Sequence, residues 1–276
     1  METQEAKVKM YVQQLVEGGQ QATIGGQGLC ELIKGSPTSA RLIVKLIVPR
    51  MDVLDSLAKV EFCGVLGCAD EAAAPHLAAI AERLTDRQAK VREAARTALG
   101  QHGKARAPAV VTAVVPLLKA NEADALIKVC SLLGELGEAA VPYLPAIAEL
   151  LTDEQAAVRE AACTALGQHG EAAVPHLPAV ADLAVMDQSP AVVRAACKAL
   201  GQHKASALVG TVVKPLLAAR DLETRCKGCK LLGELGEAAW PHLPSIAERL
   251  TDEQAAVREA ACTALGQHGE AAVPHL

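Results

Sequence analysis

Hydrophobic side chains recur every three or four residues along residues 138–170, which is the period of one face of an α-helix. The period is interrupted at Thr152 and Asp153, so the segment divides into two stripes. The first stripe comprises Leu144, Ile147 and Leu151, and the second comprises Val158, Ala162, Ala165 and Leu166. The pattern predicts two short amphipathic helices joined by a turn, with alanines that let the helices approach closely.

The residues that flank these stripes predict where each helix begins and ends. Pro142 suits the first residue of the first helix, because its missing N–H is not needed there. Asp153 is expected to cap the second helix by accepting backbone N–H bonds. Gly167 and Gly170 are expected to end it, since glycine readily adopts the left-handed conformation that follows many helices.

The same helix–turn–helix pattern recurs along most of the chain. A Leu-Gly pair ends each unit, at Gly67, Gly100, Gly134, Gly167, Gly201, Gly233 and Gly266, with spacings of 33, 34, 33, 34, 32 and 33 residues. A block of 46 residues, 132–177, is repeated at 231–276 with four differences, which are Val141/Trp240, Tyr143/His242, Ala146/Ser245 and Leu150/Arg249. Such self-similarity is typical of stacked-repeat proteins, so we expect a single solenoid over residues 1–276.

The two ends depart from this regular pattern. Residues 38–269 are predicted to form regular repeats of about 33 residues, whereas 1–37 form a divergent N-terminal capping repeat and 270–276 start a further, incomplete repeat. A first helix is expected near Gln4–Leu15. Residues 17–28 are so rich in glycine that we expect a flexible end there instead of a stable helix.

One unit carries the motif D-x-x-x-x-V-R-x-x-A-x-x-A-L-G, formed by Asp153, Val158, Arg159, Ala162, Ala165, Leu166 and Gly167. The motif recurs at Asp86, Val91 and Arg92, and at Asp252, Val257 and Arg258. These residues resemble the HEAT-repeat family, specifically its short, phycobilin-lyase-like and armadillo-type repeats. The resemblance implies an all-α fold, a right-handed α-solenoid (superhelix) of about seven helix–turn–helix repeats. It also implies that the second helices line the concave side.

The resemblance further implies a structural ladder of hydrogen bonds between successive repeats, made by an aspartate and an arginine six residues apart. Three units keep this pair, as Asp86 with Arg92, Asp153 with Arg159, and Asp252 with Arg258. Other units depart from it: residues 125–134 contain no such pair, Arg194 is displaced by one position, and Arg225 lacks the aspartate. We expect the interfaces of those units to be looser or differently bonded.

Charge and composition narrow the class of partner. The chain has a net charge of −5 with acidic and basic residues interspersed, and not the basic stripe that is typical of nucleic-acid binders. Its longest apolar run, Leu42–Val48, contains Lys45 and is too short to span a bilayer. The first ten residues do not have the layout of a signal peptide. We therefore expect no nucleic-acid partner and no membrane insertion.

Nine cysteines, seven of which follow the repeat, indicate a reducing compartment. These seven are Cys30, Cys63, Cys130, Cys163, Cys197, Cys229 and Cys262. Equivalent positions in stacked helices lie about 8–10 Å apart, whereas a disulfide needs Cα atoms within about 7 Å. We expect free thiols and a cytoplasmic or other reducing intracellular location.

Candidate catalytic chemistry is sparse. The eight histidines form two rows, one of His102, His169, His203 and His268 and the other of His76, His176, His242 and His275. Because Leu136 and Tyr143 occupy the same positions in sister units, we interpret both rows as packing positions and not as metal ligands. Cys226 and Cys229 form a C-x-x-C pair without the second pair of a zinc site, so we interpret them as half-exposed thiols. We predict no catalytic residue, no metal and no cofactor.

Two enzyme families have repeats of similar type. Deoxyhypusine hydroxylase binds two irons through His-Glu pairs in V-R-H-E-A-A, but the segments that begin at Val91, Val158 and Val257 read V-R-E-A-A. The resemblance therefore does not extend to the metal ligands, and that activity is not expected. Bilin lyases attach a tetrapyrrole to a cysteine of another protein. A bilin-lyase-like HEAT protein that acts on a chromophore or its acceptor protein stays open as the alternative function.

The expected function is a non-catalytic scaffold or adaptor that binds protein partners, as a subunit of a larger assembly. Two outward-facing rows on the second helices change from repeat to repeat while the buried rows barely change. The first row is Glu93, Ile127, Glu160, Arg194, Cys226 and Glu259, and the second is Thr97, Ser131, Thr164, Lys198, Lys230 and Thr263. Partner binding is expected at Glu93, Thr97, Glu160, Thr164, Arg194, Lys198, Lys230 and Glu259. A partner of complementary charge would be steered to a matching register.

Overall fold

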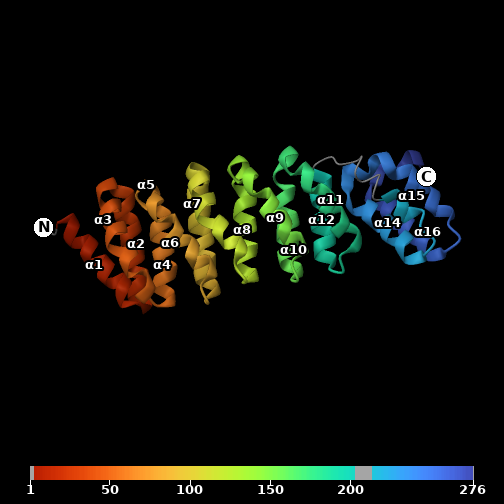
Figure 1. The fold of residues 1–276 in the computed structure, drawn as a ribbon. Coiled ribbons are helices and arrows are strands. Elements are labelled where there is room, and N and C mark those ends of the chain that lie inside the picture. Colours follow the sequence, from red (N-terminus) through yellow and green to blue (C-terminus); the bar gives the residue numbers. More distant parts are fainter. Residues whose placement is uncertain (1–2, 203–212, 276) are drawn as a thin grey trace. The chain divides into compact units, whose positions relative to one another are not determined.

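In the computed structural model, which describes residues 3–202 and 213–275, every regular element is helical. The chain divides into two compact units, Met1–Ala140 and Val141–Leu276, and each unit is a series of packed helices (Figure 1). The prediction of an all-α solenoid is confirmed as the fold class. The handedness of the superhelix and the boundaries of the capping, regular and incomplete repeats stay predictions.

The first unit contains α-helices joined by short 3-10 segments, which are labelled η. They are α1 (Gln4–Glu17), α2 (Gly19–Gly35), α3 (Pro37–Ile47), η1 (Val48–Val53), α4 (Ser56–Cys68), α5 (Asp70–Ala73), η2 (Ala74–His76), α6 (Leu77–Glu82), η3 (Arg83–Thr85), α7 (Ala89–Val114), η4 (Val115–Lys119) and α8 (Ala123–Glu135). The long helix α7 consists of two helices across a kink at Arg106, two residues before Pro108. Helix α4 packs between α2 and α7, and α8 packs against α7.

The second unit repeats the arrangement. The segment η5 (Gly137–Tyr143) leads into it, and its elements are α9 (Leu144–Glu149), η6 (Leu150–Thr152), α10 (Ala156–Gly167), η7 (Gly170–His176), α11 (Leu177–Met186), α12 (Pro190–Gln202), α14 (Leu222–Glu234), η8 (Gly236–His242), α15 (Leu243–Ala247), η9 (Glu248–Thr251), α16 (Ala255–Gln267) and η10 (Gly269–His275). Helix α10 packs against α12, and α14 packs against α16. His203 and residues 204–212 lie outside the described residues.

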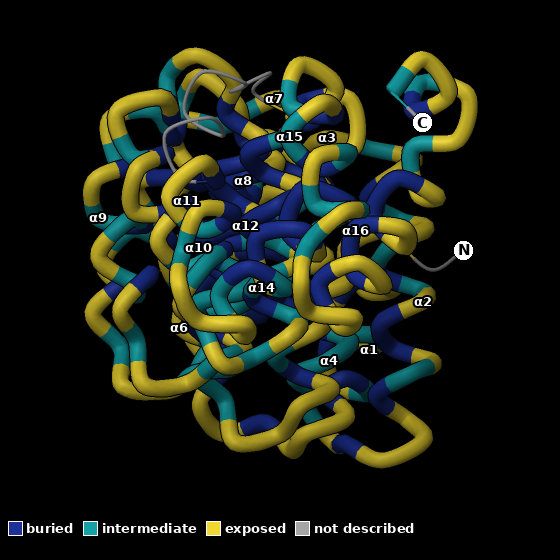
Figure 2. The backbone as a smooth tube through the Cα atoms, turned by 90° about the vertical axis from the view of Figure 1, so that its right-hand side faces the viewer, coloured by how far each residue is buried: buried dark blue, intermediate teal, exposed yellow. Residues whose placement is uncertain are grey.

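The leucine before each repeat glycine marks the core of both units. These leucines are Leu66, Leu99 and Leu133 in the first unit and Leu166, Leu200, Leu232 and Leu265 in the second, and none is more than 2% exposed. Figure 2 shows buried residues along the helices, and exposed residues both on the helices and at the turns that join them. Burial of one such side chain contributes about 1.5–3 kcal/mol, so the repeated apolar stripes are the main stabilising feature of each unit.

The glycine-rich segment near the N-terminus is helical, so the prediction of a flexible end is wrong. It forms the first half of α2, which packs on α1. A Cβ atom at Gly25 would lie 2.5 Å from the carbonyl oxygen of Tyr11, and one at Gly28 would lie 2.5 Å from the Tyr11 ring. These glycines therefore allow the two helices to approach closely, and that packing offsets their poor helix propensity.

Two predicted helix starts in the second unit also need correction. Pro142 lies inside the 3-10 segment η5, and α9 begins two residues later at Leu144. Prolines at 142 and 145 each remove a backbone donor, which disfavours a continuous α-helical ladder through both. Asp153 does not cap α10, because its Oδ1 accepts the N–H of Gln155, the residue before the helix, at 2.8 Å. It stabilises the turn that precedes the helix.

Candidate functional site

The residues predicted to bind a partner lie on second helices of the two units. In the first unit α7 carries Glu93 and Thr97. In the second unit the remaining six, Glu160, Thr164, Arg194, Lys198, Lys230 and Glu259, lie on α10, α12, α14 and α16. Glu160 is half-buried and the other seven residues are exposed. Whether they form a binding face stays a prediction.

The threonines of these rows are bonded within their own helices. The hydroxyl of Thr97 donates to the carbonyl oxygen of Glu93 at 3.0 Å, and that of Thr164 donates to the carbonyl oxygen of Glu160 at 2.9 Å. Thr263 makes the same bond to Glu259. Because the single hydroxyl proton is used locally, these side chains offer a partner an acceptor and a methyl group.

Ion pairs between neighbouring repeats already neutralise much of the exposed face of the first unit. The ammonium of Lys128 on α8 lies 2.7 Å from the carboxylate of Glu93, and this hydrogen bond holds the pKa of Glu93 below its usual range. Arg96 lies 2.6 Å from the carboxylate of Glu135 and also donates to the Ser131 hydroxyl at 3.2 Å. At these positions the first unit therefore presents little unbalanced charge to a partner.

The second unit differs, because the three exposed basic residues in its predicted binding rows form no ion pair within the described part of the unit. Arg194 and Lys198 lie on α12, and Lys230 lies on α14. Among residues 141–202 and 213–275, no carboxylate forms an ion pair with any of the three. Exposed cations that are not neutralised locally produce a positive potential, which attracts acidic groups of a partner and is screened by salt.

Arg159 joins one repeat of the second unit to the next. Its Nη1 donates to the carbonyl oxygens of Asp153 and Glu154 in its own repeat, at 2.8 and 3.0 Å. Its Nε and Nη2 donate to the two carboxylate oxygens of Asp187 in the following repeat, at 2.7 and 3.0 Å. The hydrogen bond from Arg159 lowers the pKa of Asp187, whose side chain is only 3% exposed. This bidentate pair is a structural bond and not a free binding group.

The arginines of the other two predicted ladder pairs make the same backbone bond within their own repeat. Nη1 of Arg92 donates to the carbonyl oxygen of Asp86 at 2.7 Å, and Nη1 of Arg258 donates to that of Asp252 at 2.8 Å. In each unit with this pair, the arginine thus bonds the backbone of its own aspartate residue and not the carboxylate. The carboxylates of Asp86 and Asp252 instead accept from cations of the preceding repeat, Lys59 and Arg225, both at 3.1 Å.

Sequence reasoning missed two acceptors of this ladder, Asp124 and Asp187. Asp187 stands 14 residues before Gly201, the spacing that also separates Asp153 from Gly167, so the register of the repeats contained that signal. Asp124, which bonds Arg92, stands only ten residues before Gly134 and occupies no regular position. The unit without an Asp–Arg pair is therefore differently bonded.

Two histidines of the first row contact the backbone of the preceding repeat, and for the second row the packing interpretation stays a prediction. Nε2 of His102 lies 2.9 Å from the carbonyl oxygen of Leu66, and Nε2 of His268 lies 2.9 Å from that of Leu232. Within the described part of the chain, no three His, Cys, Asp or Glu side chains are placed to hold a metal ion. Over the described residues, no helix is long and apolar enough to cross a bilayer.

One cysteine of the C-x-x-C pair is less accessible than the sequence analysis predicts. Cys229 is fully buried and only Cys226 is half-buried, so the interpretation as two half-exposed thiols is wrong for Cys229. Burial raises the pKa of Cys229 to about 11 and that of Cys63 and Cys197 to about 12. Thiols with such high pKa values are almost entirely protonated at neutral pH, and only the thiolate reacts as a nucleophile.

Cys163 and Cys262 provide a matched test of thiol burial, because they occupy the same position in the duplicated block. Cys163 is buried and its pKa is raised by that burial to about 12, whereas Cys262 is exposed. We expect iodoacetamide at pH 8 to alkylate Cys262 at least ~10-fold faster than Cys163. Peptide mass spectrometry over time measures both rates. In denaturant the two rates should become equal, and equal rates in the native protein would contradict the described burial.

The repeats match the models of a known protein family. Family models described as HEAT repeats match residues 111–184 and 145–219, and one described as HEAT repeat matches residues 242–267. No curated protein matches the chain.

Among solved structures, the chain is similar to Kap121p bound to Pho4p, with 13% identity over 98% of this chain and 33% of that chain and a TM-score of 0.58. It is likewise similar to Kap121p bound to Nup53p, with 13% identity, the same coverage and a TM-score of 0.60. The chain therefore spans about a third of Kap121p, and at this identity the similarity concerns the fold alone.

A structure of the complex of CpcE and CpcF of phycocyanin lyase from Nostoc sp. PCC7120 also matches, with 20% identity over 68% of this chain and 74% of that chain. Its TM-score of 0.40 is too low to support an argument, so the lyase alternative stays a prediction from the sequence. The matched family models, the repeat glycines and the stacked helix pairs agree with one another, and the chain belongs to the HEAT-repeat family.

Proposed function

We propose that this protein is a scaffold that binds a protein partner through the exposed face of its second helices. The observation that supports the proposal most directly is the contrast between two kinds of position on those helices. The leucine before the repeat glycine is the same and buried in all seven repeats, whereas the more exposed position three residues before the same glycine varies among Gly, Thr, Ser and Lys. Variation at this more exposed position gives the repeats different surfaces on a common frame.

The second unit supports the proposed partner binding more strongly than the first. Its three unneutralised cations Arg194, Lys198 and Lys230 are contributed by two second helices, α12 and α14. Such a cluster increases the rate of association with an acidic surface and makes that rate depend on salt. The fold supports the same class of function, because Kap121p, which has a similar fold, is seen bound to Pho4p and to Nup53p.

Reversing the charge of Lys198 and Lys230 tests this face. We expect the K198E/K230E variant to fold normally and to lose a partner that the unmodified protein retains from an extract of its source, since both side chains are exposed. The measurement is quantitative mass spectrometry of the retained polypeptides at low, moderate and high salt. Loss should be at least ~10-fold at moderate salt, which corresponds to about 1.4 kcal/mol.

A matched control reverses two other exposed cations of the same unit, in the variant K214E/R220E, which makes the same change in net charge. The control should retain the partner. If the K198E/K230E variant retains the same polypeptides in the same amounts, this face does not bind the partner and the proposal fails.

A further inference from the structure

The interface between α12 and α14 lacks the ion pair that joins the repeats of α10 and α12, and those of α14 and α16, in the same unit. In the regular pairs of the ladder, an arginine or lysine stands eight residues before one repeat glycine and an aspartate stands 14 residues before the next. Here Val193 stands at the arginine position before Gly201, and Ala219 stands at the aspartate position before Gly233. Neither residue can form a charged bond, and among the described residues no ion pair joins α12 to α14.

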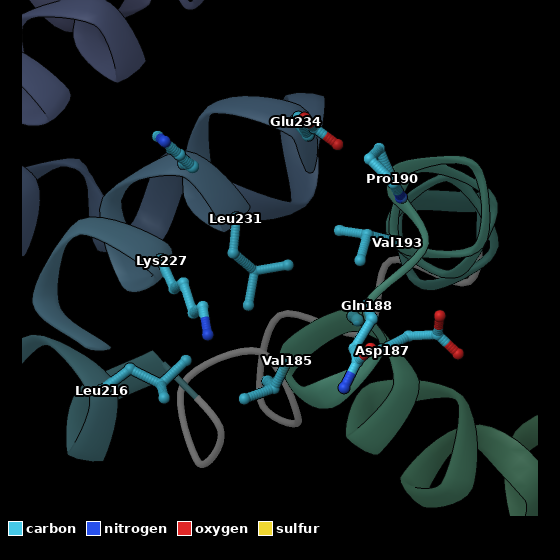
Figure 3. Close-up of a pocket in the computed structure, with 11 residues that line it drawn as sticks. Val185, Asp187, Gln188, Pro190, Val193, Leu216, Lys227, Leu231 and Glu234 are labelled. Carbon is cyan, nitrogen blue, oxygen red and sulfur yellow. The ribbon is translucent and has the colours of Figure 1, made fainter. Parts of the chain in front are cut away.

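A pocket of about 300 Å³ opens at this place. Its apolar wall comprises Val185 at the end of α11, Val193 on α12, Leu231 on α14, and Leu216, which precedes α14. Figure 3 shows Val193 and Leu231 directed toward each other across the space, with Val185 and Leu216 along another side. Leu231 is 4% exposed, and the other three are half-buried. A valine at the arginine position thus gives an apolar cavity where Arg159 and Arg225 form salt bridges in the same unit.

The charged residues that line the pocket leave a small positive excess. Lys227 and Lys230 line it together with two carboxylates, Asp187 and Glu234. Of the two acidic residues that line the pocket, Asp187 is already bound by Arg159. Among the lining residues, this leaves Glu234 to balance the positive charge of the two lysines. Lys227 also pairs with Glu223 at 2.8 Å, but both of these side chains are largely exposed, and such pairs contribute little. An approaching ligand therefore meets an apolar pocket under a positive edge.

We propose that this pocket receives one large apolar side chain from an acidic segment of a partner protein. The volume lies at the lower end of the range for small-molecule sites and suits a single leucine or phenylalanine side chain. A buried anchor surrounded by polar contacts is the arrangement that dominates many protein interfaces. This inference rests on the proposed function, and it specifies which part of the second unit binds and which chemistry the partner presents.

The test uses a phage-displayed library of random dodecapeptides, selected on the unmodified chain and on a V193F variant. The aromatic ring that this substitution introduces would fill the cavity and keep it apolar. We expect the peptides that are enriched on the unmodified chain, and not on V193F, to share a Leu or Phe with at least two Asp or Glu within four positions.

One enriched peptide is then titrated against the protein by fluorescence anisotropy. Replacing its apolar anchor by Ala, or using V193F, should each weaken binding at least ~10-fold, and K214E should leave it unchanged.

Several results would overturn the proposal. They are the absence of enrichment, enrichment of basic peptides, and equal binding by V193F, with circular dichroism showing that V193F is folded. A dimer of the unmodified chain that V193F converts to a monomer would assign the pocket to a second copy. Failure here is distinguishable from failure of the scaffold function. If K198E/K230E loses the partner and V193F keeps it, the binding face stands and only the pocket is excluded.

Discussion

Replacing Leu166 by alanine is expected to lower the free energy of unfolding by about 2–5 kcal/mol. Leu166 lies near the end of α10, is 0% exposed, and precedes Gly167, against which α12 packs so closely that a Cβ atom at Gly167 would lie 3.0 Å from that of Ala199. Backbones held this close cannot collapse into the space that the leucine leaves. The cavity would therefore persist, and the lost transfer free energy and the cavity both lower stability.

Urea denaturation followed by circular dichroism measures this effect. L166M keeps the volume of the side chain and should lose less than about 1.5 kcal/mol. L222A removes the same atoms from a leucine that is 41% exposed at the start of α14, so it should lose less than about 1 kcal/mol. A loss below about 1 kcal/mol for L166A would show that the repeat leucines are not the centre of the core.

The buried rows could be predicted from the sequence because burial acts at every repeat and leaves a period. Leu166, Leu265 and their equivalents are buried because a helix presents one face to its neighbours, and the spacing of three and four residues records that face. The exposed positions of Lys198 and Lys230 follow from the same period. The helices and the buried face of each second helix could therefore be predicted from the pattern alone.

The features that the pattern missed depend on contacts between particular residues. The helix at Gly19–Gly35 forms because α1 packs tightly on its glycines, which local helix propensity does not include. The pairing of Glu93 with Lys128 depends on which long side chains meet across two repeats. The pocket beside Val193 was not predicted either, although the displaced Arg194 marked the same interface as irregular. The sequence can thus show where the repeated ion pair is missing, but only the structure shows the cavity that forms there.

Replacing Arg159 by alanine is expected to lower the free energy of unfolding by about 2–3 kcal/mol at pH 7. The variant would leave the carboxylate of Asp187, whose side chain is 3% exposed, without its bidentate partner. Breaking a fully buried pair costs about 3–5 kcal/mol, but the side chain of Arg159 is 17% exposed, so solvent should reduce the loss.

The duplicated block offers a control with the same local sequence. Arg258 makes the same two backbone bonds, to the carbonyl oxygens of Asp252 and Glu253 at 2.8 and 3.1 Å, and no ion pair within the described residues. R258A should therefore lose less than about 1 kcal/mol. The difference between the two variants isolates the bond between repeats, because the backbone bonds are lost in both.

The dependence on pH provides a second readout for the same pair. Because Arg159 lowers the pKa of Asp187 in the folded state, the pair stabilises the protein at pH values above the unfolded pKa of about 3.9. That stabilisation is lost as the pH falls through the folded pKa, so the gap between the unmodified protein and R159A should narrow in acid, while R258A shows no such trend. Equal losses for R159A and R258A at pH 7 would show that the backbone bonds, and not the carboxylate of the next repeat, account for the contribution of the arginine.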